Sequence, residues 1–200
     1  MKPSTVFLIF LGMLWILAIT VGSYAIVNYQ FSPGTGATPQ ARWPLASKIQ
    51  LDKNRATLIM LAHPQCPCTH ASVAELSRLM SRNQDKVKAY VLFFAPQTLP
   101  RDWEERTVLR KETERIPGVT VLDDVDANEA KVFQAVTSGQ TFVYNARGDL
   151  LFNGGITAAR GQLGDSTAAR SLESTLQTQP SAKVQTALVF GCPLITPVRK

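Results

Sequence analysis

Histidine and cysteine are scarce in this sequence, and no stretch of it carries a block of like charges. The 200 residues include two His and three Cys, and an odd number of cysteines does not suit a fold held only by structural disulfides. The 21 Lys and Arg residues give a net charge of +6 but are scattered, without the run of about five or six that marks a nucleic-acid-binding tail. A GxGxxG segment and the GxxxxGK[ST] signature are both missing, so no phosphate-binding loop is predicted.

Charged residues are also absent from one long apolar stretch near the N-terminus. Residues 6–27 carry no charge, and at ~1.5 Å of rise per residue a helix of about 20 apolar residues crosses the hydrocarbon layer. The apolar part of a secretory signal is shorter, roughly 7 to 15 residues. The Ser23-Tyr24-Ala25 triplet fits a cleavage site, but the length of the stretch favours an uncleaved membrane anchor. Either interpretation exports the rest of the chain.

The charges that flank the apolar stretch predict its orientation. Lys2 precedes it, whereas residues 28–41 carry no Lys or Arg, and the positive-inside rule then places the N-terminus in the cytoplasm. We predict a single-pass protein of an inner or plasma membrane, with residues 1–27 as the anchor and the domain facing the periplasm or the exterior. Residues 28–47, rich in Pro, Gly, Ser and Thr, are a predicted linker, and residues 48–200 a folded domain.

The rest of the chain, with 45% apolar and 18% charged residues overall, alternates between strand and helix patterns. The apolar run TLIMLA at residues 57–62 is typical of a strand buried on both faces. Asp126 and Glu129 form a predicted capping pair, and Asp165 or Ser166 caps the last helix. Predicted strands cover residues 57–62, 87–94, 119–122, 141–144 and 150–152, and predicted helices cover residues 69–82, 102–116, 126–136 and 166–179.

The order of these elements, βαβαβαββα, predicts a mixed sheet. Helices between successive strands imply parallel pairing with right-handed crossovers. Residues 145–149 (NARGD), between the last two strands, indicate an antiparallel hairpin. The expected fold class is α/β, a mixed sheet flanked by helices and preceded by one N-terminal transmembrane helix.

Cys66 lies where the first strand gives way to the first helix of the domain, and Cys68 follows two residues later. A helix start presents unpaired backbone N–H groups and the positive end of the helix dipole. Both favour the thiolate, which is the nucleophile. Pro64, Pro67 and Thr69 surround the cysteines, so we expect an exposed turn and a reactive Cys66 rather than a buried, inert thiol.

The segment AHPQCPCTHASVAEL at residues 62–76 resembles the active-site segment of membrane-anchored thioredoxin-like proteins of the TlpA and peroxiredoxin type. Aligned without a gap, Pro64 and Cys66 take the places of the family's proline and attacking cysteine. The family's second cysteine falls on Thr69, one residue after Cys68.

Two later segments extend the resemblance. Residues 141–152 (TFVYNARGDLLF) resemble the family's hairpin, and the family's cis-proline falls just before it, on Gly139 or Gln140. The Cys-Pro-Cys turn together with residues 154–165 also resembles RedB-like thioredoxin-fold proteins. The resemblance covers residues 48–179 and implies a thioredoxin-like fold.

The resemblance also implies thiol–disulfide exchange without a cofactor, with thiols or disulfides of exported proteins as partners. Cys66 would be the nucleophile and Cys68 the second thiol, with Pro64, Pro67 and Thr69 supporting them. A Cys66–Cys68 disulfide closes a tighter ring than a CxxC disulfide, and strained disulfides have higher, more oxidising potentials. We therefore predict a membrane-anchored extracytoplasmic thiol–disulfide oxidoreductase.

Two other functions fit the same turn. Soft thiolates select Cu(I), so Cys66 and Cys68, with His63 and His70 beside them, are candidate ligands in a copper-binding assembly chaperone of the Sco type. The distant histidine of Sco-type chaperones has no counterpart, because both histidines of this chain adjoin the cysteines. The other alternative is a thiol peroxidase, although Thr69 follows the cysteine instead of preceding it.

Cys192 and a glycine-rich stretch lie outside these motifs. Cys192 is a candidate resolving thiol, a candidate third metal ligand, or an unpaired residue in a tail packed on the domain, and all three interpretations stay open. The glycines of residues 154–165 predict a tight path near the cysteine turn. Arg160, within this stretch, is expected to form a salt bridge or to be solvated.

Overall fold

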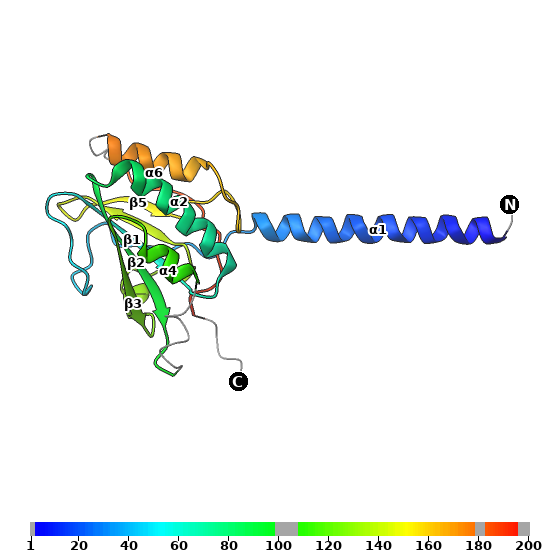
Figure 1. The fold of residues 1–200 in the computed structure, drawn as a ribbon, viewed down its shortest axis with the longest axis horizontal. Coiled ribbons are helices and arrows are strands. Elements are labelled where there is room, and N and C mark those ends of the chain that lie inside the picture. Colours follow the sequence, from blue (N-terminus) through cyan, green and yellow to red (C-terminus); the bar gives the residue numbers. More distant parts are fainter. Residues whose placement is uncertain (1–2, 99–107, 179–182, 196–200) are drawn as a thin grey trace. The chain divides into compact units, whose positions relative to one another are not determined.

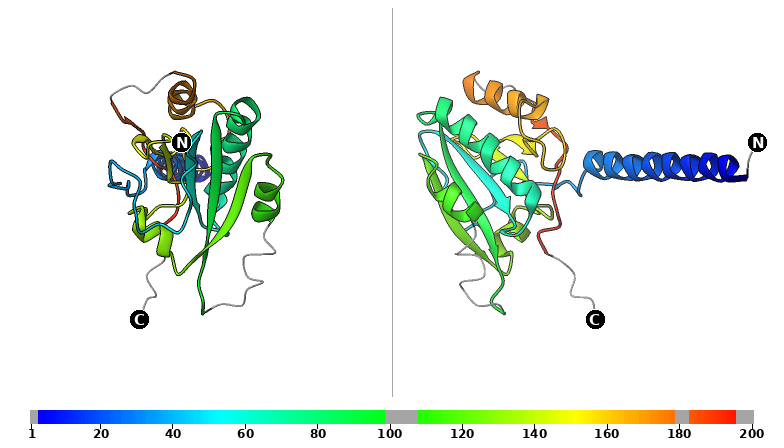
Figure 2. Two further views of the ribbon diagram at one scale, coloured as in Figure 1. Left: turned by 90° about the vertical axis from the view of Figure 1, so that its left-hand side faces the viewer. Right: turned by 45° about the vertical axis from the view of Figure 1, so that its right-hand side comes forward.

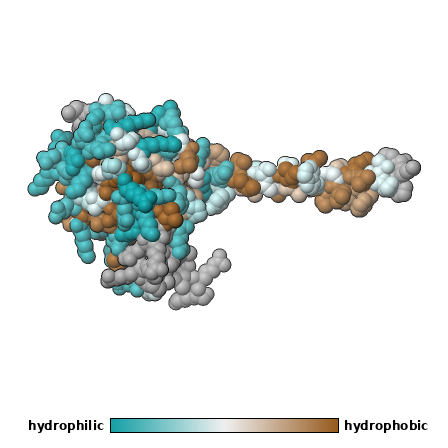
Figure 3. Space-filling view, viewed as in Figure 1, coloured by the Kyte–Doolittle hydropathy of each residue, from teal (hydrophilic) through white to brown (hydrophobic). Residues whose placement is uncertain are grey.

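The computed structural model describes residues 3–98, 108–178 and 183–195, and the chain forms two units. The first unit contains helix α1 (Pro3–Phe31), which has no charged residue. Over residues 4–31 this helix is long and apolar enough to cross a membrane, as the sequence predicts. Figure 3 shows hydrophobic surface along α1, whereas the face of the second unit in view is mostly hydrophilic.

The second unit is built around a six-stranded sheet with the order β3-β2-β1-β4-β5-β6 (Figure 1). The first three strands run parallel to one another, β4 is antiparallel to β1 and to β5, and β6 is parallel to β5. The predicted mixed sheet and hairpin are thus confirmed, and the two-residue β6 is an addition that the sequence pattern does not indicate. The strands are β1 (Ala56–Ala62), β2 (Val87–Ala95), β3 (Val119–Val125), β4 (Thr141–Tyr144), β5 (Leu150–Gly154) and β6 (Gln185–Thr186).

Strand β1 lies inside the sheet and is apolar on both faces. Leu58 and Met60 belong to one hydrophobic core, whereas Ile59 and Leu61 belong to the other, and all four side chains are fully buried. Side chains alternate between the faces of a strand, so a continuous apolar run suits a strand that is covered on both sides. Burial of each such side chain contributes about 1.5–3 kcal/mol to folding.

Helices among the described residues cover both faces of the sheet (Figure 2). Leu76, Leu109 and Leu172, from α2, α4 and α6, share the core that contains Leu58, whereas Ala130 of α5 belongs to the opposite core. The start of the helix predicted at residues 102–116 lies outside the described residues, and α4 is its described part. The helices are α2 (Pro67–Asn83), α4 (Val108–Glu114), α5 (Asn128–Val132) and α6 (Thr167–Gln177).

The helix caps agree with the sequence at α6 and differ at α5. Ser166 is the N-cap of α6, and its side chain accepts a backbone hydrogen bond, as predicted. The predicted pair of Asp126 and Glu129 does not form, because Asp126 has a positive φ of 51° and lies before the helix. Instead the Asp124 carboxylate accepts the N–H groups of Glu129 (2.8 Å) and Ala130 (2.9 Å). The resulting α5 is one short turn instead of the longer helix expected.

Residues 33–47, the greater part of the predicted linker, belong to the second unit. The N–H of Trp43 donates to the carbonyl oxygen of Gly148 (2.7 Å), and its ring meets that of Tyr144 edge-on at 5.2 Å between centroids. Residues 28–31 belong to α1 instead. Although this segment is rich in Pro and Gly, it is not a free linker, because its backbone and the ring of Trp43 contact the rest of the domain.

Candidate thiol site

The Cys-Pro-Cys turn connects the end of β1 to the start of α2. Cys66 is the N-cap residue of α2, with extended dihedrals (φ −85°, ψ 114°), and Pro67 is the first helical residue. The N–H of Cys66 donates to the carbonyl oxygen of His63 (3.1 Å), and the carbonyl oxygen of Cys66 accepts from the N–H of Thr69 (3.0 Å). Pro64, inside the turn, is buried. The predicted position of Cys66 at a helix start is confirmed, and the helix dipole there favours a thiolate.

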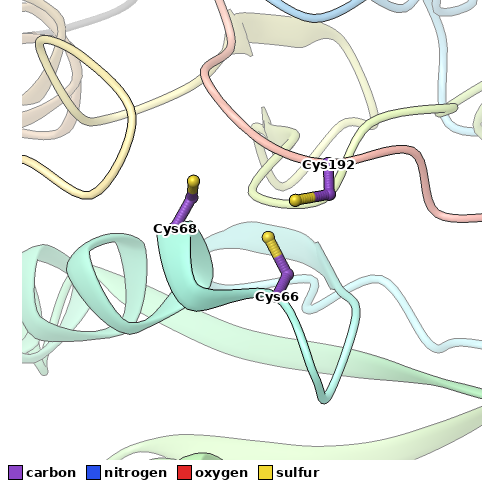
Figure 4. Close-up of side chains that lie close together, drawn as sticks. All are labelled: Cys66, Cys68 and Cys192. Carbon is purple, nitrogen blue, oxygen red and sulfur yellow. The ribbon is translucent and has the colours of Figure 1, made fainter. Parts of the chain in front are cut away.

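The expectation of an exposed turn is wrong, because both cysteines of the turn are buried. Cys66 is 2% exposed and Cys68 is 8% exposed. Figure 4 shows the reason, since the C-terminal segment that carries Cys192 passes across the turn. We call residues 188–194 the covering segment.

The covering segment pairs through its backbone with the loop that precedes β4. The N–H of Ser138 donates to the carbonyl oxygen of Cys192 (2.8 Å), and the N–H of Leu194 donates to that of Val136 (2.9 Å). Gly191 lies so close to this loop that a Cβ atom there would overlap the carbonyl oxygen of Ser138. Because β4 is the neighbour of β1 in the sheet, this pairing carries Cys192 to the end of β1.

The sulfur atoms of Cys66, Cys68 and Cys192 form one cluster, and all three Sγ atoms lie within 4.8 Å of one another. Figure 4 shows the three side chains facing a shared space from the turn, the first turn of α2 and the covering segment. None of the three is in a disulfide. The sequence motif contains two of these thiols, and only the fold brings the third beside them.

The three thiols differ in their tendency to ionise. Burial opposes ionisation of Cys66, but hydrogen bonds from Thr69 and Cys192 outweigh it, so the pKa of Cys66 lies below its usual value. Burial, together with the charge on Cys66, raises the pKa of Cys68. Burial and the hydrogen bond to Cys66 also raise the pKa of Cys192. The positive charge of Arg160 opposes these last two shifts, and Cys66 is the thiol of the cluster that ionises most readily.

Polar side chains tie the turn to its neighbouring loops. The hydroxyl groups of Thr69 and Ser138 share a buried hydrogen bond of 2.6 Å, and Ser138 Oγ also accepts the N–H of His63 (2.8 Å). The guanidinium of Arg160 donates from Nη1 to the carbonyl oxygen of Gly191, so the glycine-rich stretch also contacts the covering segment. The sequence predicts a salt bridge or solvation for Arg160. It does not predict this hydrogen bond, because Gly191 lies far from Arg160 in the sequence.

The two histidines lie outside the group of three sulfurs. The ring of His63 stacks on Phe94 at 5.7 Å between centroids, its Nδ1 accepts the N–H of Gln65 (3.2 Å), and burial lowers its pKa. His70 is about half exposed, and its Nδ1 is 3.7 Å from the carboxylate of Glu112. Neither histidine belongs to the group of three sulfurs, and the set of metal ligands that includes His63 and His70 stays a prediction.

The sheet order, the helices on both faces and the cysteine turn between β1 and α2 define a thioredoxin-like fold. An uncharacterized conserved protein from Geobacillus kaustophilus is 20% identical, with a TM-score of 0.59 over 84% of this chain and 95% of that chain. A hypothetical protein from Sinorhizobium meliloti 1021 is 18% identical, with a TM-score of 0.58 over 82% of this chain and 93% of that chain. These likenesses concern the fold alone. No protein-family model and no curated protein matches the sequence.

Proposed function

We propose that this chain is a membrane-anchored, extracytoplasmic thiol–disulfide oxidoreductase with Cys66 as its nucleophile. The observation that carries the proposal is the position of Cys66 at the N-cap of α2, with a second cysteine in the first turn of the helix. The pKa of Cys66 is lowered although the residue is buried, because Thr69 and Cys192 donate hydrogen bonds to its sulfur. A thiol of lowered pKa beside a second thiol is the arrangement that disulfide exchange requires.

The exchange takes place in two balanced steps. The Cys66 thiolate attacks one sulfur of a partner's disulfide, which forms a mixed disulfide and releases the partner's other sulfur as a thiolate that takes up a proton. Cys68 then loses its proton and attacks the Cys66 sulfur, which releases the second partner thiolate. The partner ends as a dithiol, and the domain ends with a Cys66–Cys68 disulfide. The reverse sequence oxidises a partner dithiol by the same bonds.

Access to Cys66 requires movement of the covering segment, because the nucleophile is 2% exposed. The segment is held by backbone hydrogen bonds such as that from Ser138 to Cys192, by the contact from Arg160 to Gly191, and by buried apolar side chains, namely Val189, Phe190 and Leu194. Local opening of this segment, without global unfolding, would expose the sulfur. Partners of the proposed enzyme are thiols or disulfides of exported proteins, which reach the sulfur in the open form.

The proposed location rests on α1. A helix of this length and apolarity is suited to span a membrane once, and Lys2 before it places the N-terminus in the cytoplasm by the positive-inside rule. The domain then lies in the periplasm or outside the cell. Disulfides form and persist in such oxidising compartments, which is where exchange between them is useful.

The first prediction is tested with the full chain in detergent micelles, by following the reduction of insulin disulfides in the presence of dithiothreitol. The C66S variant is expected to reduce insulin no faster than dithiothreitol alone, because serine supplies no thiolate. The matched control is H70A, which changes an exposed side chain on the same helix turn and is expected to keep the rate. Full activity of C66S would refute the assignment of the nucleophile. Hydrogen peroxide in place of insulin tests the peroxidase alternative.

A further inference from the structure

Three cysteines from two distant parts of the chain meet at one buried point. Their Sγ atoms lie within 4.8 Å of one another, and no other histidine, cysteine or acidic group of the described residues belongs to the cluster. In the disulfide exchange proposed above, Cys66 and Cys68 form and break the sulfur–sulfur bonds, whereas Cys192 only donates a hydrogen bond to Cys66. We propose that Cys66, Cys68 and Cys192 together bind one Cu(I) ion as a three-thiolate site. This inference goes beyond the proposed exchange reaction and does not depend on it.

The geometry of the sulfurs suits a three-coordinate ion. With metal–sulfur bonds of about 2.3 Å, as in zinc–thiolate sites, three sulfurs in a plane around the ion lie about 4 Å apart. The observed separations have an upper limit of 4.8 Å, so small side-chain adjustments are enough to close the site. Figure 4 shows that the three side chains already face the space that the ion would occupy.

The chemistry of the donors selects Cu(I) among the common ions. Thiolates are soft ligands and favour Cu(I), whereas Mg²⁺, Ca²⁺ and Mn²⁺ prefer oxygen donors. Structural Zn²⁺ takes four ligands in a tetrahedron, and among the described residues this cluster offers three. Water does not readily complete the shell, because Cys66 and Cys68 are 2% and 8% exposed.

The surroundings accommodate the charge of the bound state. Each thiol gives up its proton on binding, so one Cu(I) with three thiolates carries a net charge of −2. The start of α2 presents the positive end of its dipole to Cys66 and Cys68. Arg160, which holds the carbonyl oxygen of Gly191, adds a positive charge that acts on Cys68 and Cys192.

Copper and disulfide exchange compete for the same sulfur atoms. A bound ion would join the covering segment to the turn through Cys192 and keep Cys66 covered. Conversely, a disulfide between any two of the three cysteines removes two ligands and abolishes the site. The reduced chain is therefore the copper-binding form, and the oxidised chain is not.

The test uses the full chain, reduced and kept anaerobic in detergent micelles, titrated with Cu(I) against a coloured Cu(I) chelator. We expect one copper per chain, with three sulfur scatterers per copper in X-ray absorption spectra. The C192S variant is expected to bind at least about tenfold more weakly, since loss of even an outer-shell partner costs about 10–100-fold in metal affinity. Its copper is expected to show two sulfur scatterers.

Matched variants and metals separate the alternatives. H63A and H70A are expected to bind Cu(I) like the parent chain, and the far-UV circular dichroism of every variant is recorded to verify folding. C68S serves as a second ligand variant and is expected to lose one sulfur scatterer as well. Unchanged affinity and coordination in both C192S and C68S would overturn the proposal, as would tight binding of Zn²⁺ in preference to Cu(I). Insulin reduction without copper binding would support the proposed function and refute this inference. Copper binding without insulin reduction would support this inference and refute the proposed function.

Discussion

At the scale of single residues, the ionisation of Cys66 depends on the hydrogen bonds that its sulfur receives. Burial works against the thiolate, whereas the hydrogen bonds from Thr69 and Cys192 work for it, and their sum lowers the pKa. The hydroxyl of Thr69 is itself held by Ser138 at 2.6 Å, so its position is set by a buried pair. Thr69, which the sequence alignment places where the family has its second cysteine, therefore acts as a positioning residue in this chain.

The second prediction follows from this contact. Replacement T69V removes the hydroxyl donor, so the pKa of Cys66 should rise and the thiolate should form only at higher pH. The rate of iodoacetamide alkylation at Cys66, followed by mass spectrometry as a function of pH, should then reach half of its plateau at a higher pH than in the parent chain. T69S keeps the hydroxyl and should restore the parental profile. Coincident profiles for T69V and the parent chain would rule out a role for this hydrogen bond.

At the scale of elements, the covering segment decides whether the thiols can be reached. Its close approach to the loop before β4 is possible because residue 191 is glycine, with no side chain to meet the carbonyl oxygen of Ser138. A side chain there must push the segment outward, and overpacking of this kind costs about 1–3 kcal/mol.

The third prediction is that G191A opens the site. A shift of about 1–3 kcal/mol toward the open form corresponds to about a 5- to 150-fold change in its population, and Cys66 should be alkylated faster by a factor in that range. G36A is the matched control, because a Cβ atom at Gly36 meets nothing within 4 Å and the alkylation rate should stay the same. If G191A reacted no faster than the parent chain, the covering segment would not be the barrier to access.

The start of α5 supplies the fourth prediction. The carboxylate of Asp124 accepts two backbone N–H groups, and burial raises its pKa. D124N keeps one acceptor oxygen but turns an amide N–H₂ toward the second backbone donor, so the free energy of unfolding should fall by about 1–2 kcal/mol. Urea unfolding of the chain in micelles, followed by circular dichroism, measures this loss. D126N should have a smaller effect, since Asp126 lies before the helix and the amide oxygen of asparagine can still accept the N–H of Gln97. An equal loss in both variants would contradict the assignment of the cap.

At the scale of the whole molecule, the chain joins an apolar helix to a thioredoxin-like domain. The helix has no charged residue, and nothing in its sequence resembles the amphipathic pattern of the domain's helices. Over residues 4–31 the helix is long and apolar enough to cross a membrane, and the proposed anchoring rests on these two properties.

The fifth prediction concerns this anchor. In a bacterium with two membranes, the full-length chain should stay in the membrane pellet after an alkaline carbonate wash. The wash disrupts electrostatic contacts with the membrane surface but does not extract an apolar helix that spans the bilayer. Protease added to spheroplasts should digest the domain while a cytoplasmic marker survives. A chain lacking residues 1–32 serves as the control and should appear in the soluble fraction. Recovery of a shortened chain in the soluble periplasmic fraction would instead identify the apolar helix as a cleaved signal.

Local patterns allowed most of the fold to be predicted from the sequence. The apolar run of β1 and the Ser166 cap depend on neighbouring residues only, and both are confirmed. The cap of α5 was mispredicted, because Asp126 and Glu129 have capping spacing whereas the actual acceptor is Asp124, selected by the path that β3 imposes on the chain. Strand β6 has two residues and no local sequence signal. Its pairing with β5 depends on the path that the chain takes after α6.

The apolar helix, the alternation of strands and helices, and the position of Cys66 and Cys68 at a helix start could be predicted, because each depends on residues close together in the chain. The burial of Cys66 and its proximity to Cys192 arise from tertiary contacts alone. Those features depend on backbone pairing between the covering segment and the loop before β4. Contacts between distant segments form through the geometry of the completed sheet, and no local pattern of side chains encodes them.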